Sequence, residues 1–241
     1  YGHHRDLHLS IRRQRQMCIR DRAWTDDGRT SGNRELDSTK VSGLVSALDG
    51  LSIVGVRPKP DGLSSSLRRA AEGGITRAEV VSLQSRGYYL TREGDLRSNE
   101  GELRVRTTEG ILYTLRFGEV LYGTGSVITA GVDPSSEADS GPGENRYLFI
   151  TAEFERDRFP EPPLPVNMDF EGKGDDDLSD DDRTNRTRHE IHSEWAAQVL
   201  AGEERLIELN NRFGPWYYVI SSESFENVRL TREDVTKEKA N

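Results

Sequence analysis

At residues 102–118 the chain reads ELRVRTTEGILYTLRFG, with two runs of alternating apolar and polar residues on either side of a Glu-Gly pair. Alternation with a period of two is typical of strands, and a glycine-containing break between two such runs is typical of a tight turn. The stretch therefore predicts a β-hairpin, and the pairing of its apolar residues decides how the sheet is built.

The register of this hairpin follows from the length of its loop. A two-residue loop would scatter the apolar side chains over both faces. A three-residue loop at 108–110 gathers them on one face, with Gly110 in the left-handed conformation that closes such a loop with a bulge. The side chains gathered there are Leu103, Val105, Thr107, Ile111, Tyr113 and Leu115. We expect that face to be the core face. The face with Arg104, Arg106 and Arg116, where Glu102 lies opposite Arg116, is expected to be solvated.

Apolar spacing and turn residues predict the elements around the hairpin. Ser38 precedes an amphipathic repeat that Gly50 ends, and Thr76 and Glu79 form a capping-box pattern. We expect helices over about 38–50, 63–71 and 76–87, and strands over 51–56, 88–91, 146–154, 216–220 and 228–230. The strand at 146–154 is apolar on both faces, so it should be central. The strand at 51–56 should end before Pro58, because proline lacks a backbone donor.

A long helix is predicted near the C-terminus. Apolar residues from Ile191 to Phe213 recur every three or four positions and form a narrow seam, which Gly214-Pro215 ends. Before it, residues 160–186 are rich in proline and then in aspartate, and we expect a mobile acidic insertion there. Helices before and after hairpin-linked strands indicate an α+β fold with a mainly antiparallel sheet, formed as a single domain over 23–241.

The first 22 residues differ from the rest of the chain. Residues 10–22, SIRRQRQMCIRDR, resemble the translation of a transposon-type sequencing adapter. We interpret residues 1–22 as a non-native, disordered scar joined to an N-terminally truncated protein, and exclude them from the fold. The alternative is a genuine basic arm.

Excluding this stretch changes the chemistry that remains. Cys18 is the only cysteine, so disulfides, thiolate metal sites and cysteine nucleophiles are excluded from residues 23–241. The whole chain has a net charge of −9, and the first 22 residues hold six Arg and two Asp, so the remainder carries −13. That charge disfavours nucleic acid and anionic membrane surfaces as partners. No apolar run approaches the roughly 20 residues that a membrane-spanning helix needs.

Two short patterns invite a metal-binding interpretation. His189-Glu-Ile-His192 places two histidines three apart rather than the four of the zinc-protease helix, and no third ligand is marked. Asp175, Asp177, Ser179 and Asp181 alternate like the first ligands of a calcium loop, but Asp180 and Arg186 replace its glycine and its final glutamate. A surface helix and a solvated acidic linker are the favoured interpretations, with weak divalent binding as the alternative.

Other candidates are equally weak as sequence signals. Gly123-Thr-Gly125 lacks the third glycine of a dinucleotide site. Glu100, Glu102 and Glu119 flank the hairpin and are the candidates for an acid and base pair, although exposure at strand ends is favoured. The last candidate is an aromatic cluster of Phe213, Trp216, Tyr217 and Tyr218. It is interpreted as a binding surface or, as the alternating burial of a strand favours, as part of the core. We therefore name no catalytic, cofactor-binding or metal-binding residue.

Four passages resemble a known family. They are LSIVGVRPKP at 51–60, SNEG at 98–101 with YTLRFGE at 113–119, NRYLF at 145–149, and LNNRFGPWYYVI at 209–220. Together they resemble the C-terminal part of planctomycete-type proteins in the family known as domain of unknown function 4340, over roughly residues 36–235. The resemblance implies no catalytic residues.

The resemblance does imply a location. Members of that family typically have an N-terminal membrane anchor and extracytoplasmic domains, and some accompany transporter components. We expect a noncatalytic extracytoplasmic interaction or scaffold domain of a membrane-anchored bacterial protein, with envelope or transporter proteins as partners. The alternatives are an accessory subunit of a transporter complex and an envelope-polymer hydrolase that uses carboxylates.

Overall fold

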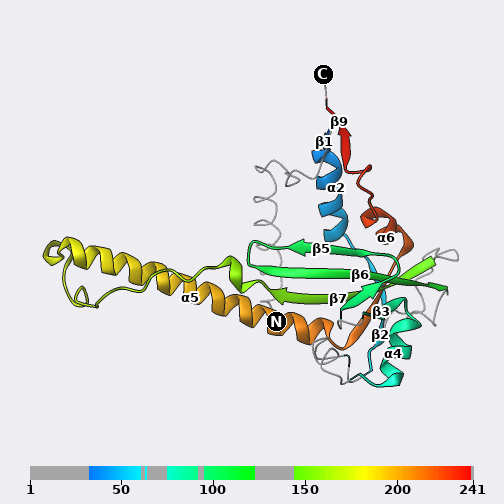
Figure 1. Cartoon of the computed structure of the whole chain (residues 1–241), viewed down its shortest axis with the longest axis horizontal. Coiled ribbons are helices and arrows are strands. Elements are labelled where there is room, and N and C mark those ends of the chain that lie inside the picture. Colours follow the sequence, from blue (N-terminus) through cyan, green and yellow to red (C-terminus); the bar gives the residue numbers. More distant parts are fainter. Residues whose placement is uncertain (1–32, 61–62, 64–74, 92–94, 123–143, 240–241) are drawn as a thin grey trace, which may run out of the picture. The chain divides into compact units, whose positions relative to one another are not determined.

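The computed structural model describes residues 33–60, 63, 75–91, 95–122 and 144–239. The described residues fall into two compact units, one within Ile53–Ser222 and a smaller one formed by residues 33–52 and 223–239. Each unit is described by itself. The scar at 1–22, the glycines at 123–125 and most of the helix predicted over 63–71 lie outside the described residues. Within them the α+β fold with a mainly antiparallel sheet is confirmed (Figure 1).

The larger unit is built on a five-stranded antiparallel sheet. Its strands, in spatial order, are β2 Ile53–Pro58, β8 Trp216–Ile220, β7 Glu144–Phe154, β6 Ile111–Tyr122 and β5 Glu102–Arg106. The prediction that the strand near 146–154 is central is confirmed. Pro58, expected outside the ladder, instead pairs with Trp216. It is tolerated because β2 is an edge strand, whose last residue needs no donor on its open side.

The hairpin of β5 and β6 has the predicted register. Leu103 lies opposite Leu115, Val105 opposite Tyr113, and Glu102 opposite Arg116. Gly110 has a φ of 81°, as the three-residue loop requires.

The prediction that the other face of the hairpin is solvated is wrong for β6. Thr114 is 1% exposed and Arg116 is 9% exposed, although Arg104 is exposed as expected. Arg116 is buried because strand β4, Leu96–Ser98, lies over it and accepts a hydrogen bond from its Nε at the Leu96 carbonyl, 3.0 Å away. The sheet is therefore covered on both faces at β6, a consequence of packing that no local pattern reveals.

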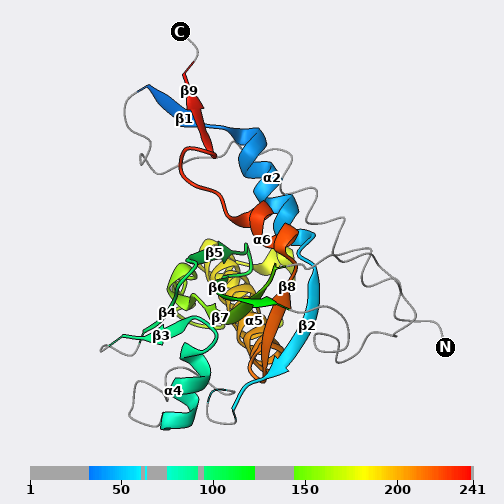
Figure 2. The same cartoon turned by 90° about the vertical axis from the view of Figure 1, so that its right-hand side faces the viewer.

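Different elements cover the two faces of the sheet (Figure 2). Helix α5, Asp180–Phe213, packs on one face through Leu209, which contacts Ile111 and Ala152. Helix α4, Arg77–Gln84, and the small sheet of β3, Tyr88–Leu90, with β4 are associated with the other face. The core of that second face consists of Leu63, Leu83, Tyr88, Leu96, Tyr147, Phe149, Tyr217 and Val219. The predicted capping box of α4, from Thr76 to Glu79, is present.

Helix α5 begins at Asp180, well before the predicted start at Ile191. Ser179 caps it, and the Asp182 side chain completes a capping box. Three aspartates in the first turn favour a helix start there, because they face the positive end of the helix dipole. The acidic run expected in a mobile insertion at 160–186 therefore supplies the short 3-10 turn Asp175–Asp177 and the beginning of this helix. The mobility itself stays a prediction.

The smaller unit contains β1, Arg34–Leu36, paired with β9, Thr236–Glu238, together with helix α2, Ser38–Asp49. Helix α6, Ser222–Val228, leads into it. The strand predicted over 228–230 is wrong, since Val228 ends α6 and the final strand comes later. Phe225 and Val228 are buried three residues apart, a helical spacing that a short apolar pattern does not distinguish from a strand.

Candidate functional site

The three glutamates that flank the hairpin are engaged by three different partners. Glu100 lies 3.3 Å from Arg146, and Glu102 lies 3.2 Å from Arg116. Glu119 accepts a hydrogen bond of 2.9 Å from the Asn99 amide. Each contact ties one strand end or loop to its neighbour, and the carboxylates are not brought together as an acid and base pair would be.

The two histidines of α5 face the segment that precedes the helix. The His192 Nε2 lies 3.3 Å from the Glu161 carboxylate, and the His189 ring packs against Phe170 with 5.7 Å between ring centroids. Each histidine therefore has a separate packing partner. Among the described residues, no cluster of three or more His, Cys, Asp or Glu is placed to hold a metal ion.

The aspartates of the calcium-loop pattern are held by basic residues and by the helix cap. The Asp175 carboxylate lies 2.6 Å from the Arg186 guanidinium, the residue that replaces the final ligand of such a loop. The Asp182 carboxylate is buried and accepts hydrogen bonds from Lys173 and Ser179, which hold its pKa down at about 2. These contacts stabilise the start of α5.

The aromatic cluster near the end of α5 is mainly part of the core. Tyr217 is fully buried and Tyr218 nearly so, whereas Trp216 is 39% exposed. The Tyr217 ring stacks on Tyr88, with centroids 6.1 Å apart, and meets Phe149 edge-on. Burial raises the pKa of both the Tyr88 and the Tyr217 phenol, so these hydroxyls stay protonated at neutral pH.

Lys59 is the most unusual titratable residue of the described chain, and the sequence analysis missed it. It is 7% exposed, and burial lowers the pKa of its amine to about 7. Its Nζ lies 3.7 Å from the centroid of the Phe149 ring and donates to the Phe213 carbonyl at the end of α5. Both contacts favour the ammonium form. The sequence signal was a lysine between two prolines directly after an apolar strand.

Lys59 acts structurally rather than as a nucleophile. A reactive amine needs access to a substrate, and this one is covered by Phe149 and by the C-terminal turn of α5. Its hydrogen bond satisfies one of the last carbonyls of the helix, which have no partner within the helix itself. Lys59 therefore fastens the end of α5 to the chain that follows β2.

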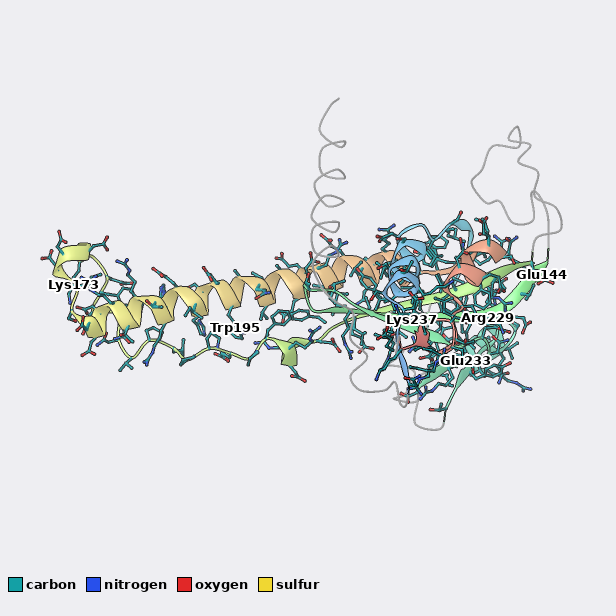
Figure 3. All side chains as sticks on the ribbon, turned by 90° about the horizontal axis from the view of Figure 1, so that it is seen from above. Glu144, Lys173, Trp195, Arg229, Glu233 and Lys237 are labelled. Carbon is teal, nitrogen blue, oxygen red and sulfur yellow. The ribbon has the colours of Figure 1, made fainter. Side chains whose placement is uncertain are left out.

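The first half of α5 packs against the segment that precedes it in the chain rather than against the sheet. We call residues 159–198 the arm. The Trp195 indole donates a 2.9 Å hydrogen bond to the Phe159 carbonyl, and the buried Asn185 amide bonds the Val166 N–H and the Asn167 side chain. Figure 1 shows the segment after β7 running outward to a turn from which α5 returns alongside it, and Figure 3 places Lys173 at that turn and Trp195 between the two layers.

The arm has buried side chains of its own and exposes several apolar side chains. Phe170 and Leu178 are buried in it, as are the hydrogen-bonded Asp182 and Asn185. Several large apolar side chains are nevertheless exposed: Leu164 at 60%, Val166 at 80%, Met168 at 38% and Ile191 at 49%. Exposed apolar groups on one segment that also has buried side chains are typical of a contact surface.

The comparisons with known proteins give no further assignment. No family model, no curated protein and no solved structure matches the chain. Among the helices that the structure describes, none has the length and apolar character required to cross a membrane.

Proposed function

We propose that the protein is a noncatalytic interaction or scaffold domain and that the arm is its contact surface. The observation that supports this most directly is the combination of buried, hydrogen-bonded polar side chains with exposed apolar side chains in the arm. A segment that only linked two elements would not need buried Asn185 and Asp182, each of which requires a matched set of partners.

The candidate catalytic groups favour the same proposal. Glu100 and Glu102 each form an ion pair with an arginine that is itself about nine-tenths buried. These ion pairs hold neighbouring segments together, and the two carboxylates are engaged by different arginines instead of facing each other as an acid and base pair would. The chemistry of the hairpin is therefore that of a scaffold.

The proposal includes an extracytoplasmic location in a membrane-anchored bacterial protein, which rests on the resemblance described above. Envelope or transporter proteins are the partners that the resemblance suggests.

A crosslinking experiment tests the arm as a contact surface. A photoreactive phenylalanine derivative is introduced at Val166, and at the matched exposed positions Tyr89 of β3 and Val81 of α4. In cells of the source organism, we expect a discrete adduct from Val166 and none from the two controls. Equal adducts at all three positions, or none at Val166, would contradict the proposal. An adduct with twice the mass of the chain would show that the arm binds a second copy.

A further inference from the structure

The segment at the start of the arm has a burial pattern with a period of three. Phe159, Pro162 and Pro165 are half-buried, while the two residues between successive members of this series are exposed. A period of three is that of the polyproline II helix, which has three residues per turn. Four prolines in six residues, PEPPLP at 160–165, favour the same conformation. We call residues 159–167 the ribbon.

The ribbon contains two interleaved Pro-x-x-Pro repeats that face different directions. Pro162 and Pro165 form the half-buried ridge, and Pro160 and Pro163 form an exposed ridge that continues to Val166. A third ridge, Glu161, Leu164 and Asn167, is partly tied to α5, because Glu161 meets His192 and Asn167 meets Asn185. The ridge of Pro160, Pro163 and Val166 is thus displayed outward.

The chemistry of the exposed ridge selects one class of partner. Prolines supply no backbone donor, so a sheet edge is a poor match for it. Grooves lined by aromatic side chains bind Pro-x-x-Pro ridges, since successive prolines fill slots between the rings. Anchoring on α5 holds the ribbon in place before binding, which reduces the entropy lost on association.

The charge of the arm tip indicates the charge that its partner should carry. The arm tip carries Asp169 and Glu171 and the two aspartate runs at 175–177 and 180–182, which together outnumber the bases Lys173, Arg183 and Arg186. A groove with a basic rim complements this surface, and its association with the arm weakens as salt is added. A second copy of this chain is a poor match, because the exposed aromatic residues of the described chain, Tyr89 and Trp216, lie on separate strands.

We infer that the ridge of Pro160, Pro163 and Val166 is a preformed polyproline II ligand for a protein partner with an aromatic-lined, basic-rimmed groove. The inference rests on the proposed function, because it names the partner class for the arm. It makes the arm the recognised element of a complex in which the groove belongs to the other protein.

The inference is tested with the full chain and a purified, isotope-labelled WW domain, a small module with an aromatic groove, as the probe. We expect saturable shifts of the groove resonances. Pro163→Ala and Val166→Asp should each weaken binding about tenfold or more, which corresponds to about 1.4 kcal/mol. Val81→Ala, an exposed apolar control on α4, should stay within about twofold. Unchanged circular dichroism melting curves show that the variants remain folded.

Two results would overturn the inference. One is the absence of groove shifts with the wild-type chain, and the other is equal binding by the Pro163→Ala, Val166→Asp and Val81→Ala variants. Crosslinking from Val166 separates this outcome from a failure of the proposed function. If adducts persist in cells when Pro163 is replaced, the arm has a partner but the ridge is not its ligand.

Discussion

Burial of the Lys59 amine makes the stability of the folded chain depend on pH. Its pKa is lowered from an ordinary 10.5 to about 7 in the folded chain. Between these values the unfolded chain binds a proton that the folded chain has released, so the free energy of unfolding rises with pH. This contribution is fully present above 10.5 and is lost as the pH falls through about 7.

Lys59→Met provides the test of this linkage. Methionine fills a similar volume without a charge, so the difference in unfolding free energy between wild type and variant isolates the amine. We expect wild type to gain relative to the variant by up to about 1.4 kcal/mol per pH unit between pH 7 and pH 10. Chemical denaturation at several pH values measures it. A flat difference across this range would show that Phe149 and the Phe213 carbonyl keep the amine charged.

Arg116 and Arg106 allow a buried and an exposed ion pair of one hairpin to be compared. The Arg116 side chain is 11% exposed and pairs with Glu102, whereas Arg106 is 57% exposed and pairs with Glu155. Glu102→Gln should cost about 2–4 kcal/mol, because it leaves a buried guanidinium without its counter-charge. Arg106→Gln should cost less than about 1 kcal/mol. Urea titration of both variants measures this, and similar costs would mean that Arg116 is solvated in solution.

At the scale of an element, two glycines make room for an aromatic pair that joins the hairpin loop to α5. Phe154 and Phe159 stack with centroids 5.7 Å apart. A Cβ at Gly110 would meet the Phe159 ring, and a Cβ at Gly202 would meet the Phe154 ring, each at a distance no real contact shows. Gly202 therefore does more than weaken a helix interior, because the helix approaches the sheet through it.

Alanine substitutions at two helical glycines should have opposite effects. Gly202→Ala gains helix propensity but displaces the Phe154 ring, and we expect a net loss of about 1–3 kcal/mol. Gly43→Ala in α2 has open space around the added Cβ and should gain about 0.5–1 kcal/mol. Thermal and urea unfolding measure both changes. Stabilisation by Gly202→Ala would mean that the ring moves aside at no cost.

At the scale of the whole molecule, the two compact units differ in how much they bury. Helix α2 of the smaller unit has no fully buried residue, whereas Ile111, Leu148 and Val219 of the central sheet are at most 1% exposed. Local opening costs least where few apolar contacts are lost. In native-state hydrogen exchange, we expect the amides of α2 to exchange at least about tenfold faster than those of β6, β7 and β8. Equal protection would indicate one cooperative unit.

Sequence predicted the parts of this fold that local patterns determine. The hairpin register and Gly110 followed from alternation and loop length, and the α4 cap followed from Thr76 and Glu79. Burial of Arg116 could not be predicted, because it depends on β4, which belongs to a separate small sheet and lies over this side chain. The start of α5 was missed because a run of aspartates is typical of a solvated linker but also favours a helix N-terminus. Lys59 was missed because its burial arises from Phe149 and Phe213, which are distant in sequence.

The ribbon follows β7 with only residues 155–158 between them, so tension applied to the ribbon would reach the sheet at Phe154. Part of that load would pass to α5 through the hydrogen bond from the Trp195 indole to the Phe159 carbonyl. The hydrogen bonds of β7 to β6 and β8 run across the axis of β7, so tension along it shears many of them together instead of opening them one by one. Tension in β7 would therefore be resisted by its ladders with both neighbouring strands together.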